Sequence, residues 1–546
     1  EFYSTELEEI VPELNTLEKQ LKVVVNILHA MGKKVWMDVI PHTDRYSQMV
    51  IASPQYFEWL QRQDTIIISH RDNLHEEVQE KILQFLEIYG PAIPKDKYPE
   101  TKEAFFDPSF SENERMRILF GLPQTTRNRA IRRGSIVRYL CSYGYEPVPS
   151  TMAPPFRGIE VDLNNEARII DNYGNTWRDY KMKKPTGMSR VFGPLTRYKL
   201  YNRVDNNSNW EIDFESVRHE VWDYVCKHYF KIQTRYGFDF MRGDMSHVQM
   251  RPNGVPPKVD KYYDLLGGIK NYIQEKGAPY FGYLAETFLP FRDVFGYGEE
   301  IDHLEASNAD STLGNLQSTC VGSREFLCKI RKYYDYLSVR SCIPCFTIMT
   351  SDKDDPRFDE YYRKGSILRL FIGFFLGDIP TYNALGFETR DIHYHPAPNE
   401  HYTKLYVLQE NYGPKATLEP YIWGKNGHLY KKVTKLKICL DNIWNDIVTK
   451  GTMWLIHPDP FGANKIIAWT QKKEPKYIFV ANVDTEKNSS YFALPFIPGI
   501  TKNKELKLVY STQIHNVKED QVLLSNGKHY RMENMKPGEG RIYSLD

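Results

Sequence analysis

The chain has few of the features that place a protein in a class at sight. Its 546 residues include only 7 cysteines, an odd and scattered set, so it is not built on the disulfide framework of small secreted domains. Cys342 and Cys345 form one Cys-x-x-Cys pair, but no second pair and no neighbouring histidine completes a zinc site. We therefore interpret these two cysteines as strand residues.

Long apolar runs are also missing. The longest, from Ile367 to Leu376, contains Arg369 and is far too short to cross a bilayer, so we expect no membrane partner. No signal peptide is visible, and a cytoplasmic protein is expected. The first residue is Glu1 rather than Met, so the sequence leaves open whether an upstream segment has been removed.

An excess of charge of either sign is absent as well. Lys and Arg number 71 against 70 Asp and Glu, so the net charge of +1 gives no general attraction for nucleic acid or an anionic surface. No His and Asp cluster has metal-ligand spacing, and we expect no metal site. Repeats and low-complexity tracts are missing too.

What the chain does have is a series of apolar runs that each end at a carboxylate. Asp38, Asp244, Glu286 and Asp354 follow such runs in chain order. In a parallel β/α barrel the carboxyl ends of the strands carry the chemistry, so this order predicts a barrel mouth lined by acids. Paired carboxylates of this kind suit cleavage of a glycosidic bond, in which one acts as a protonated acid and the other as a nucleophile or base.

The helix pattern agrees with an α/β fold. Residues 16–31 have the periodicity of an amphipathic helix, with Asn15 as the expected cap, an apolar face that begins at Leu17 and Gly32 as the stop. The stretch 42–215 is polar and breaks the alternation, and we interpret it as an inserted subdomain. After about residue 455, short alternating runs predict an antiparallel β-domain. Further helices are expected at 214–235, 259–276, 323–337 and 359–375.

With these motifs, the chain from about residue 15 onward resembles glycoside hydrolase family 13, the α-amylase family. The resemblance implies a (β/α)8 TIM barrel, a subdomain inserted after the third strand and a C-terminal antiparallel β-sandwich. The first two strands of such a barrel would precede residue 1, so the barrel is either incomplete in this chain or completed by something else. The expected domains are residues 1–41 (barrel start), 42–215 (insertion), 216–455 (remaining barrel) and 456–546 (β-domain).

The resemblance also implies roles for the acids. Asp244 corresponds to the nucleophile, Glu286 to the acid/base and Asp354 to the third carboxylate, which binds the distorted sugar. Arg242, two residues before the nucleophile on the same strand, is expected to hold Asp244 ionised. Asp38 corresponds to the structural Asp of the first motif, and Arg357 belongs to the motif of Asp354.

The chain departs from the family at several sugar-binding positions. The usual Asn-His pair of the first motif falls at His42 and Thr43, and the usual His before the third acid is Lys353. After the nucleophile, the usual Lys-His pair falls at His247 and Val248. We predict that His42, His247 and Lys353 bind substrate instead. No cofactor is required, and calcium is in doubt because His42 replaces its usual ligand.

The same departures resemble the bacterial maltosyltransferases, through Ile40-Pro-His-Thr43, Asp244-Met-Ser-His247 and Asp354-Asp-Pro-Arg357. The prediction is a retaining enzyme that transfers maltosyl or glucanosyl units between α-1,4-glucans, with its two carboxyls roughly 5–5.5 Å apart. An amylase-type hydrolase and a non-catalytic sugar-binding relative are the alternatives, and the oligomeric state is open. Trp177 and Trp210 are candidates for stacking on acceptor sugars, although core packing suits either ring.

Overall fold

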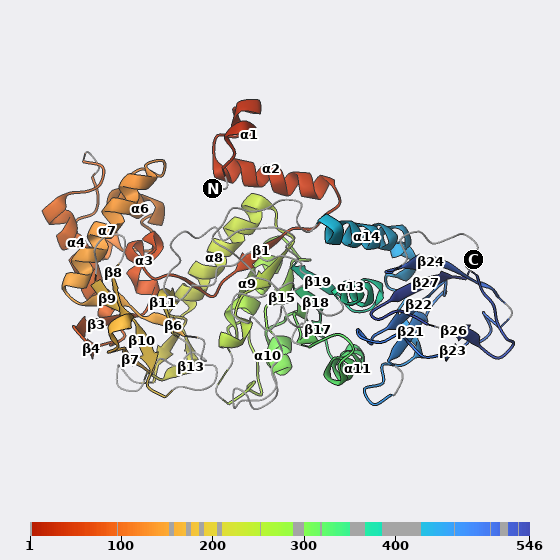
Figure 1. The fold of residues 1–546 in the computed structure, drawn as a ribbon. Helices are drawn as coiled ribbons and strands as arrows, with labels where there is room; N and C mark the ends of the chain where they lie inside the picture. The colour runs from red at the N-terminus through yellow and green to blue at the C-terminus, as the bar shows by residue number, and fades with distance from the viewer. Residues whose placement is uncertain are drawn as a thin grey trace. The chain divides into compact units, whose positions relative to one another are not determined.

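The computed structural model describes sixteen stretches of the chain. They are residues 3–94, 97–151, 158–170, 176–184, 191–204, 210–249, 251, 253–287, 300–316, 319–349, 366–384, 427–462, 465–502, 504–513, 522–532 and 534–545. Two compact units divide the chain, Glu1–Asp310 and Ser311–Asp546. Figure 1 shows the ribbon in chain order. Within the described residues no helix combines the length and apolar character needed to cross a membrane.

Three parallel strands form the centre of the first unit. They are β1 (Trp36–Val39), β14 (Phe240–Gly243) and β15 (Gly282–Ala285), and β14 lies between the other two. Helix α8 (His219–Tyr236) precedes β14, helix α9 (Leu265–Lys276) connects β14 to β15, and these two helices pack against each other. The alternation of strand and helix predicted after residue 215 is therefore present.

Glycines permit the close contacts around these helices. Helix α8 ends at Gly237, which adopts the left-handed conformation with φ of 78° that suits a residue without a Cβ. In α9, a Cβ on Gly268 would lie 2.8 Å from the Trp222 ring of α8, so only glycine admits that indole. Trp222 is buried, and its Nε1 donates to the Leu200 carbonyl over 3.1 Å.

The N-terminal helix differs in detail from its prediction. Helix α2 spans Leu17–Ala30, and its cap is Thr16 rather than Asn15, since the Thr16 side chain accepts from the Lys19 amide over 3.3 Å. Of the predicted apolar face, Val25 is buried, whereas Leu17 is 47% exposed. The hydrophobic periodicity thus predicted the helix but not which residues of its apolar face are buried.

The predicted insertion has a small core of its own. Its strands share a cluster of buried residues that includes Leu60, Val148 and Trp210. Trp210 stacks on His70 with the ring centroids 3.6 Å apart and is only 2% exposed, so it packs in the core as the alternative interpretation had it. The Trp177 side chain lies outside the described residues.

The remaining elements of the first unit are mostly short. The helices are α1 (Thr5–Ile10), α3 (Gln48–Ala52), α4 (Leu74–Tyr89), α5 (Lys102–Phe105), α6 (Glu112–Phe120), α7 (Thr126–Ser142) and α10 (Glu300–Ala306), with 3-10 turns η1 (Pro54–Tyr56), η2 (Asn165–Ala167) and η3 (Ser246–Gln249). The strands are β2 (His42–Asp44), β3 (Trp59–Gln63), β4 (Ile66–Ser69), β5 (Tyr145–Pro147), β6 (Pro149–Thr151), β7 (Ile159–Val161), β8 (Arg168–Ile170), β9 (Thr176–Arg178), β10 (Tyr180–Met182), β11 (Val191–Arg197), β12 (Tyr201–Arg203) and β13 (Ile212–Val217).

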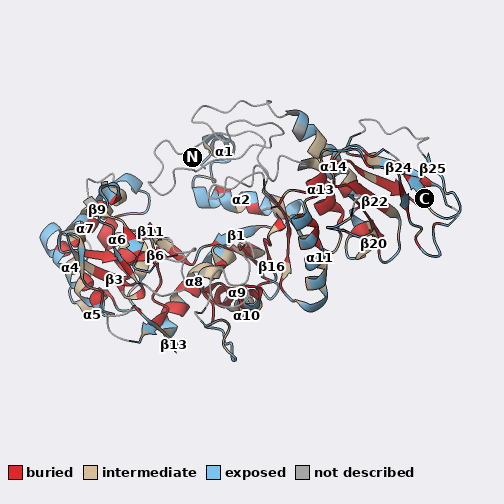
Figure 2. Cartoon of the chain, turned by 60° about the horizontal axis from the view of Figure 1, so that its bottom comes forward, coloured by how far each residue is buried: buried red, intermediate tan, exposed pale blue. Residues whose placement is uncertain are grey.

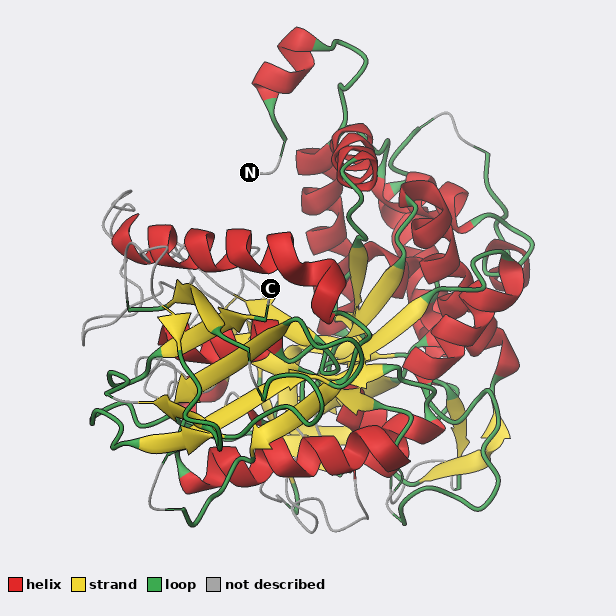
Figure 3. Ribbon diagram, turned by 90° about the vertical axis from the view of Figure 1, so that its right-hand side faces the viewer, coloured by secondary structure: helices red, strands yellow, loops and turns green. Residues whose placement is uncertain are grey.

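The second unit contains the predicted antiparallel β-domain. A six-stranded antiparallel sheet has the order β20-β21-β22-β27-β24-β25, and Figure 3 shows its strands as yellow arrows. Trp469 of β21 is buried, and its Nε1 donates to the Phe375 carbonyl over 2.9 Å. Figure 2 shows buried residues along these strands and along α13. Antiparallel pairing in this region is confirmed.

The elements of this second unit include helices as well as strands. Helices are α11 (Arg324–Val339), α13 (Ser366–Phe375) and α14 (Gly427–Ile447). Two parallel pairs are β16 (Ser311–Thr312) with β17 (Ile343–Pro344) and β18 (Phe346–Met349) with β19 (Thr381–Ala384). The others are β20 (Thr452–Ile456), β21 (Ile466–Gln471), β22 (Tyr477–Asn482), β23 (Phe492–Leu494), β24 (Leu506–Ser511), β25 (Val522–Leu523), β26 (Tyr530–Met532) and β27 (Gly540–Ser544).

These units together contain mixed helices and sheets, as an α/β fold requires. The closed (β/α)8 barrel is not shown by the described residues, and it stays a prediction. The four predicted domain boundaries likewise stay predictions.

Candidate active site

Strand register brings three of the four predicted acids to one edge of the first unit's sheet. Asp38 of β1 pairs with Arg242 of β14, and both strands run in the same direction. Asp244 follows β14 directly, and its amide donates to the Val39 carbonyl over 2.8 Å. Glu286 follows β15, and its amide donates to the Gly243 carbonyl over 2.8 Å. The carboxyl ends of parallel strands therefore place these side chains together, as predicted.

Arg242 connects the three carboxylates. Its Nη1 donates to both Asp38 oxygens over 2.8 and 3.0 Å and lies 3.6 Å from Asp244 Oδ1. Its Nη2 lies 3.0 Å from Glu286 Oε1. A guanidinium presents its donors in a rigid planar fork, so one arginine can orient several acids at once. Its location beside Asp244 is as the sequence predicted.

Glu286 has the electrostatic environment of a proton donor. Burial, together with the charge and the hydrogen bond of Asp244, raises the pKa of Glu286 to about 8, against the opposing effects of Arg242 and the Met245 amide. The carboxyl is therefore protonated near neutral pH and donates to Asp244. Only 18% of its side chain is exposed. A protonated carboxyl beside a second acid is what acid-assisted displacement requires.

The charge of the buried Arg197 acts on both His42 and His247. His42 sits on β2 opposite Arg197 of β11, and burial together with the Arg197 charge lowers the pKa of His42 to about 3. His247 lies in η3, where burial and then the charges of His303 and Arg197 lower its pKa to about 4. Both rings are neutral at pH 7. Their predicted contact with substrate stays a prediction.

A divalent cation does not fit at His42, the position of the family's usual calcium ligand. The ring is 6% exposed, and its nearest charge is the guanidinium of Arg197, which repels a cation. Among the described residues, no group of three or more His, Cys, Asp and Glu side chains is arranged to hold a metal ion.

The remaining predicted residues are Lys353, Asp354 and Arg357. All three lie outside the described residues. Their roles therefore rest on the sequence alone.

Two functional neighbours were missed by the sequence reasoning. Arg197 fixes its guanidinium through Nε, which donates to Ser150 Oγ over 3.3 Å, and through Nη2, which donates to the Thr151 carbonyl. Tyr229 of α8 donates to the Ile40 carbonyl over 2.9 Å, and burial, then the charges of Asp38 and Asp244, raise its pKa to about 12. Neither residue has a local sequence signal, because the hydrogen-bond partners of each lie far from it in the chain.

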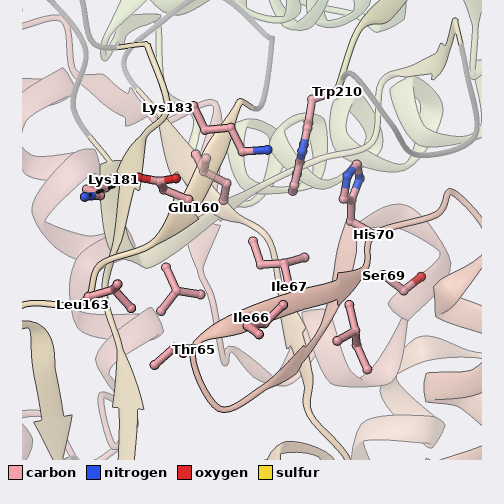
Figure 4. Close-up of a pocket in the computed structure, with 13 residues that line it drawn as sticks. Thr65, Ile66, Ile67, Ser69, His70, Glu160, Leu163, Lys181, Lys183 and Trp210 are labelled. Atoms are coloured by element: carbon pink, nitrogen blue, oxygen red, sulfur yellow. Dashed lines mark ion pairs between the residues drawn. The ribbon is translucent and has the colours of Figure 1, made fainter.

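Two hollows of the first unit lie apart from these acids. One of 400 Å³ is lined by strand β4 and residues such as Glu160, Lys181 and His70 (Figure 4). A larger one of 990 Å³ is lined by residues that include Phe214 and Arg251. Trp210 lines both hollows, whereas the described acids Asp38, Asp244 and Glu286 line neither.

Comparison with known proteins gives weak similarity. No family model and no curated protein matches the chain. Among solved structures, it is similar to an α-amylase from Geobacillus thermoleovorans complexed with acarbose (12% identity, TM-score 0.42, 62% of this chain and 66% of that one). It is also similar to an α-amylase from Malbranchea cinnamomea (13%, 0.38, 62% and 62%) and to a pullulanase from Anoxybacillus complexed with maltotetraose (12%, 0.36, 63% and 48%).

The chain thus spans less than two thirds of the length of each of these structures. TM-scores below 0.5 do not establish a common fold.

Proposed function

We propose that the chain is a retaining enzyme acting on α-1,4-glucans, which transfers maltosyl or glucanosyl units between maltodextrins. The observation that carries the proposal is the arrangement of Arg242 among Asp38, Asp244 and Glu286, with a protonated Glu286 beside Asp244. The sequence motifs around these residues supply the substrate class.

Each residue has one task in the proposed double displacement. Glu286 protonates the glycosidic oxygen while Asp244 attacks the anomeric carbon, and a covalent glycosyl-enzyme forms. Glu286, now ionised, then takes a proton from the incoming sugar hydroxyl or from water. Arg242 stabilises Asp244 in its ionised form before the attack. Asp354 is expected to hold the sugar, on the motif alone.

The contact between the two carboxyls bears on the stereochemistry. Glu286 and Asp244 are hydrogen-bonded, so their carboxyl groups lie closer together than the roughly 6.5–9.5 Å at which an inverting enzyme accommodates a water molecule. A sugar that binds between the two carboxyls is expected to break this hydrogen bond. Breaking it frees the Glu286 proton for the leaving group.

The test uses two donors and two variants. Wild type with maltotetraose and glucose is expected to yield products longer than the donor, while Asp244→Asn loses activity by roughly 10³-fold or more on any donor. Glu286→Gln should lose roughly 10²–10⁴-fold on maltotetraose but retain glycosyl-enzyme formation from α-maltosyl fluoride, because fluoride departs without protonation. Time-resolved chromatography and mass spectrometry of the trapped intermediate report both steps.

Other results would change the assignment. Only shorter sugars would indicate an amylase-type hydrolase. Inverted products would exclude the covalent intermediate, and binding of α-glucans without turnover would indicate a non-catalytic relative.

A further inference from the structure

Met245, the residue after the proposed nucleophile, has an unusual backbone. Its φ is 51°, in the left-handed region that side chains with a Cβ seldom adopt. In this conformation its amide donates to Glu286 Oε2 over 3.2 Å, and that bond lowers the pKa of Glu286 against the effect of burial. A conformation of this kind persists only when the surroundings hold it.

Ser246 provides the first part of that support. The residue is fully buried, and its Oγ donates to the Gly243 carbonyl over 2.9 Å and accepts from the Tyr283 hydroxyl over 3.1 Å. Its backbone carbonyl accepts from His303 Nε2 over 3.0 Å. Both ends of Ser246 are therefore fixed, and Met245 lies between this anchor and the end of β14.

His303 of α10 provides the second part. The ring is 1% exposed, and its Nδ1 lies 2.8 Å from the Tyr263 hydroxyl. Because a carbonyl can only accept, Nε2 must carry the proton and donate to Ser246, which leaves Nδ1 to accept from Tyr263. Burial and the Arg251 charge lower the pKa of His303 to about 4, so this tautomer is neutral near pH 7. His247 is a further titratable group that interacts with the ring.

We propose that Tyr263, His303 and Ser246 form a positioning chain that holds the Met245 amide on Glu286 and thereby sets how readily Glu286 gives up its proton. The proposal rests on the proposed function, since it assigns the chain to the acid of that reaction. None of the three residues touches the reacting atoms, so they are positioning residues. Tyr263 fixes the His303 tautomer, His303 fixes the Ser246 carbonyl, and Ser246 fixes the turn.

A pair of substitutions separates the two bonds of His303. His303→Gln places an amide nitrogen near the position of Nε2 and can still donate to Ser246, whereas His303→Asn reaches only the position of Nδ1 and loses that bond. The matched control is Tyr224→Phe in the same unit, which removes a buried hydroxyl that donates to Glu112 Oε1 over 2.6 Å, away from the nucleophile turn. Each variant first has its unfolding midpoint measured.

Two readouts test the chain. Amide hydrogen exchange of the peptide that contains Met245 should become at least several-fold faster in His303→Asn, but not in His303→Gln or Tyr224→Phe. With maltotetraose as substrate, the alkaline limb of kcat/KM should move up by about half a pH unit in His303→Asn, because the amide that favours ionised Glu286 is lost. The kcat should fall about tenfold, and rates with α-maltosyl fluoride should fall less.

The outcomes are distinct for the two proposals. Unchanged exchange and an unchanged pH profile in His303→Asn would overturn the positioning chain, as would effects in His303→Gln or in the Tyr224→Phe control as large as those in His303→Asn. If wild type cleaves neither donor, the proposed function fails, and the exchange rates alone still decide whether the chain holds Met245.

Discussion

Arg242 donates from Nη1 and Nη2 to acids on three strands or their ends, and a lysine ammonium cannot reproduce that fork. We expect Arg242→Lys to lower kcat/KM on maltotetraose by roughly 10²–10³-fold. The alkaline limb of its pH profile should move upward, because the opposing charge that lowers the pKa of Glu286 becomes more distant. Steady-state rates between pH 5 and 10 measure both effects.

Arg541→Lys is the matched control for this change, since Arg541 pairs with Glu539 through a similar fork in the second unit. A loss of equal size in both variants would mean that Arg242 acts through general stability rather than through the acids.

Glu300 is a second buried carboxyl, and neither of its oxygens has a hydrogen-bond partner among the residues that the structure describes. It is 5% exposed, and burial alone raises its pKa to about 8. The pKa of Glu300 in the folded protein lies above its value of about 4.3 in the unfolded chain. The contribution of Glu300 to stability is therefore fully present below about pH 4.3. That stability is lost as the pH rises through about 8.

We therefore expect Glu300→Gln to match wild type in urea unfolding at pH 4 and to exceed it at pH 9 by on the order of 1 kcal/mol or more. Equal stabilities of the two proteins at pH 9 would contradict the assignment of a protonated Glu300.

At the scale of elements, α9 approaches the end of α10 at Gly267. A Cβ there would lie 2.4 Å from the Ser307 carbonyl oxygen, which is backbone and cannot turn aside. Gly267→Ala is expected to lower the free energy of unfolding by roughly 1–3 kcal/mol. Gly158→Ala, where no atom of the described residues lies within 4 Å of the added Cβ, should change it by less than about 0.5 kcal/mol. Urea denaturation measures the free energy of unfolding of both variants, and equal effects would contradict the close packing of Gly267 against Ser307.

Elements also show what a sequence can predict. Asp38, Asp244 and Glu286 could be placed together because each follows an apolar run, and parallel strands end at one edge. The Thr16 cap was misassigned by one residue, since Asn15 has the same capping chemistry. His303 could not be predicted, because it meets Ser246 from 57 positions away in the chain and its contact is a backbone carbonyl.

At the scale of the whole molecule, each of the two units has buried residues of its own. Glu146 of the first unit is fully buried between Arg45 and Arg62, and accepts from the Tyr180 hydroxyl over 2.8 Å. Gly322 of the second unit has φ of 78°, and a Cβ there would lie 1.7 Å from the Val483 carbonyl oxygen. One substitution can therefore weaken each unit from within.

Because each unit has its own interior, we expect calorimetry of the full chain to show two unfolding transitions. Glu146→Gln leaves two cations without their buried carboxylate, which costs about 3–5 kcal/mol, and it should lower the midpoint of one transition. Gly322→Ala should lower the midpoint of the other, through clash and backbone strain. Hydrogen exchange of the peptides that contain Phe57, in the first unit, and Trp469, in the second, assigns each transition to its unit. A single transition that both variants shift equally would show instead that the units unfold as one.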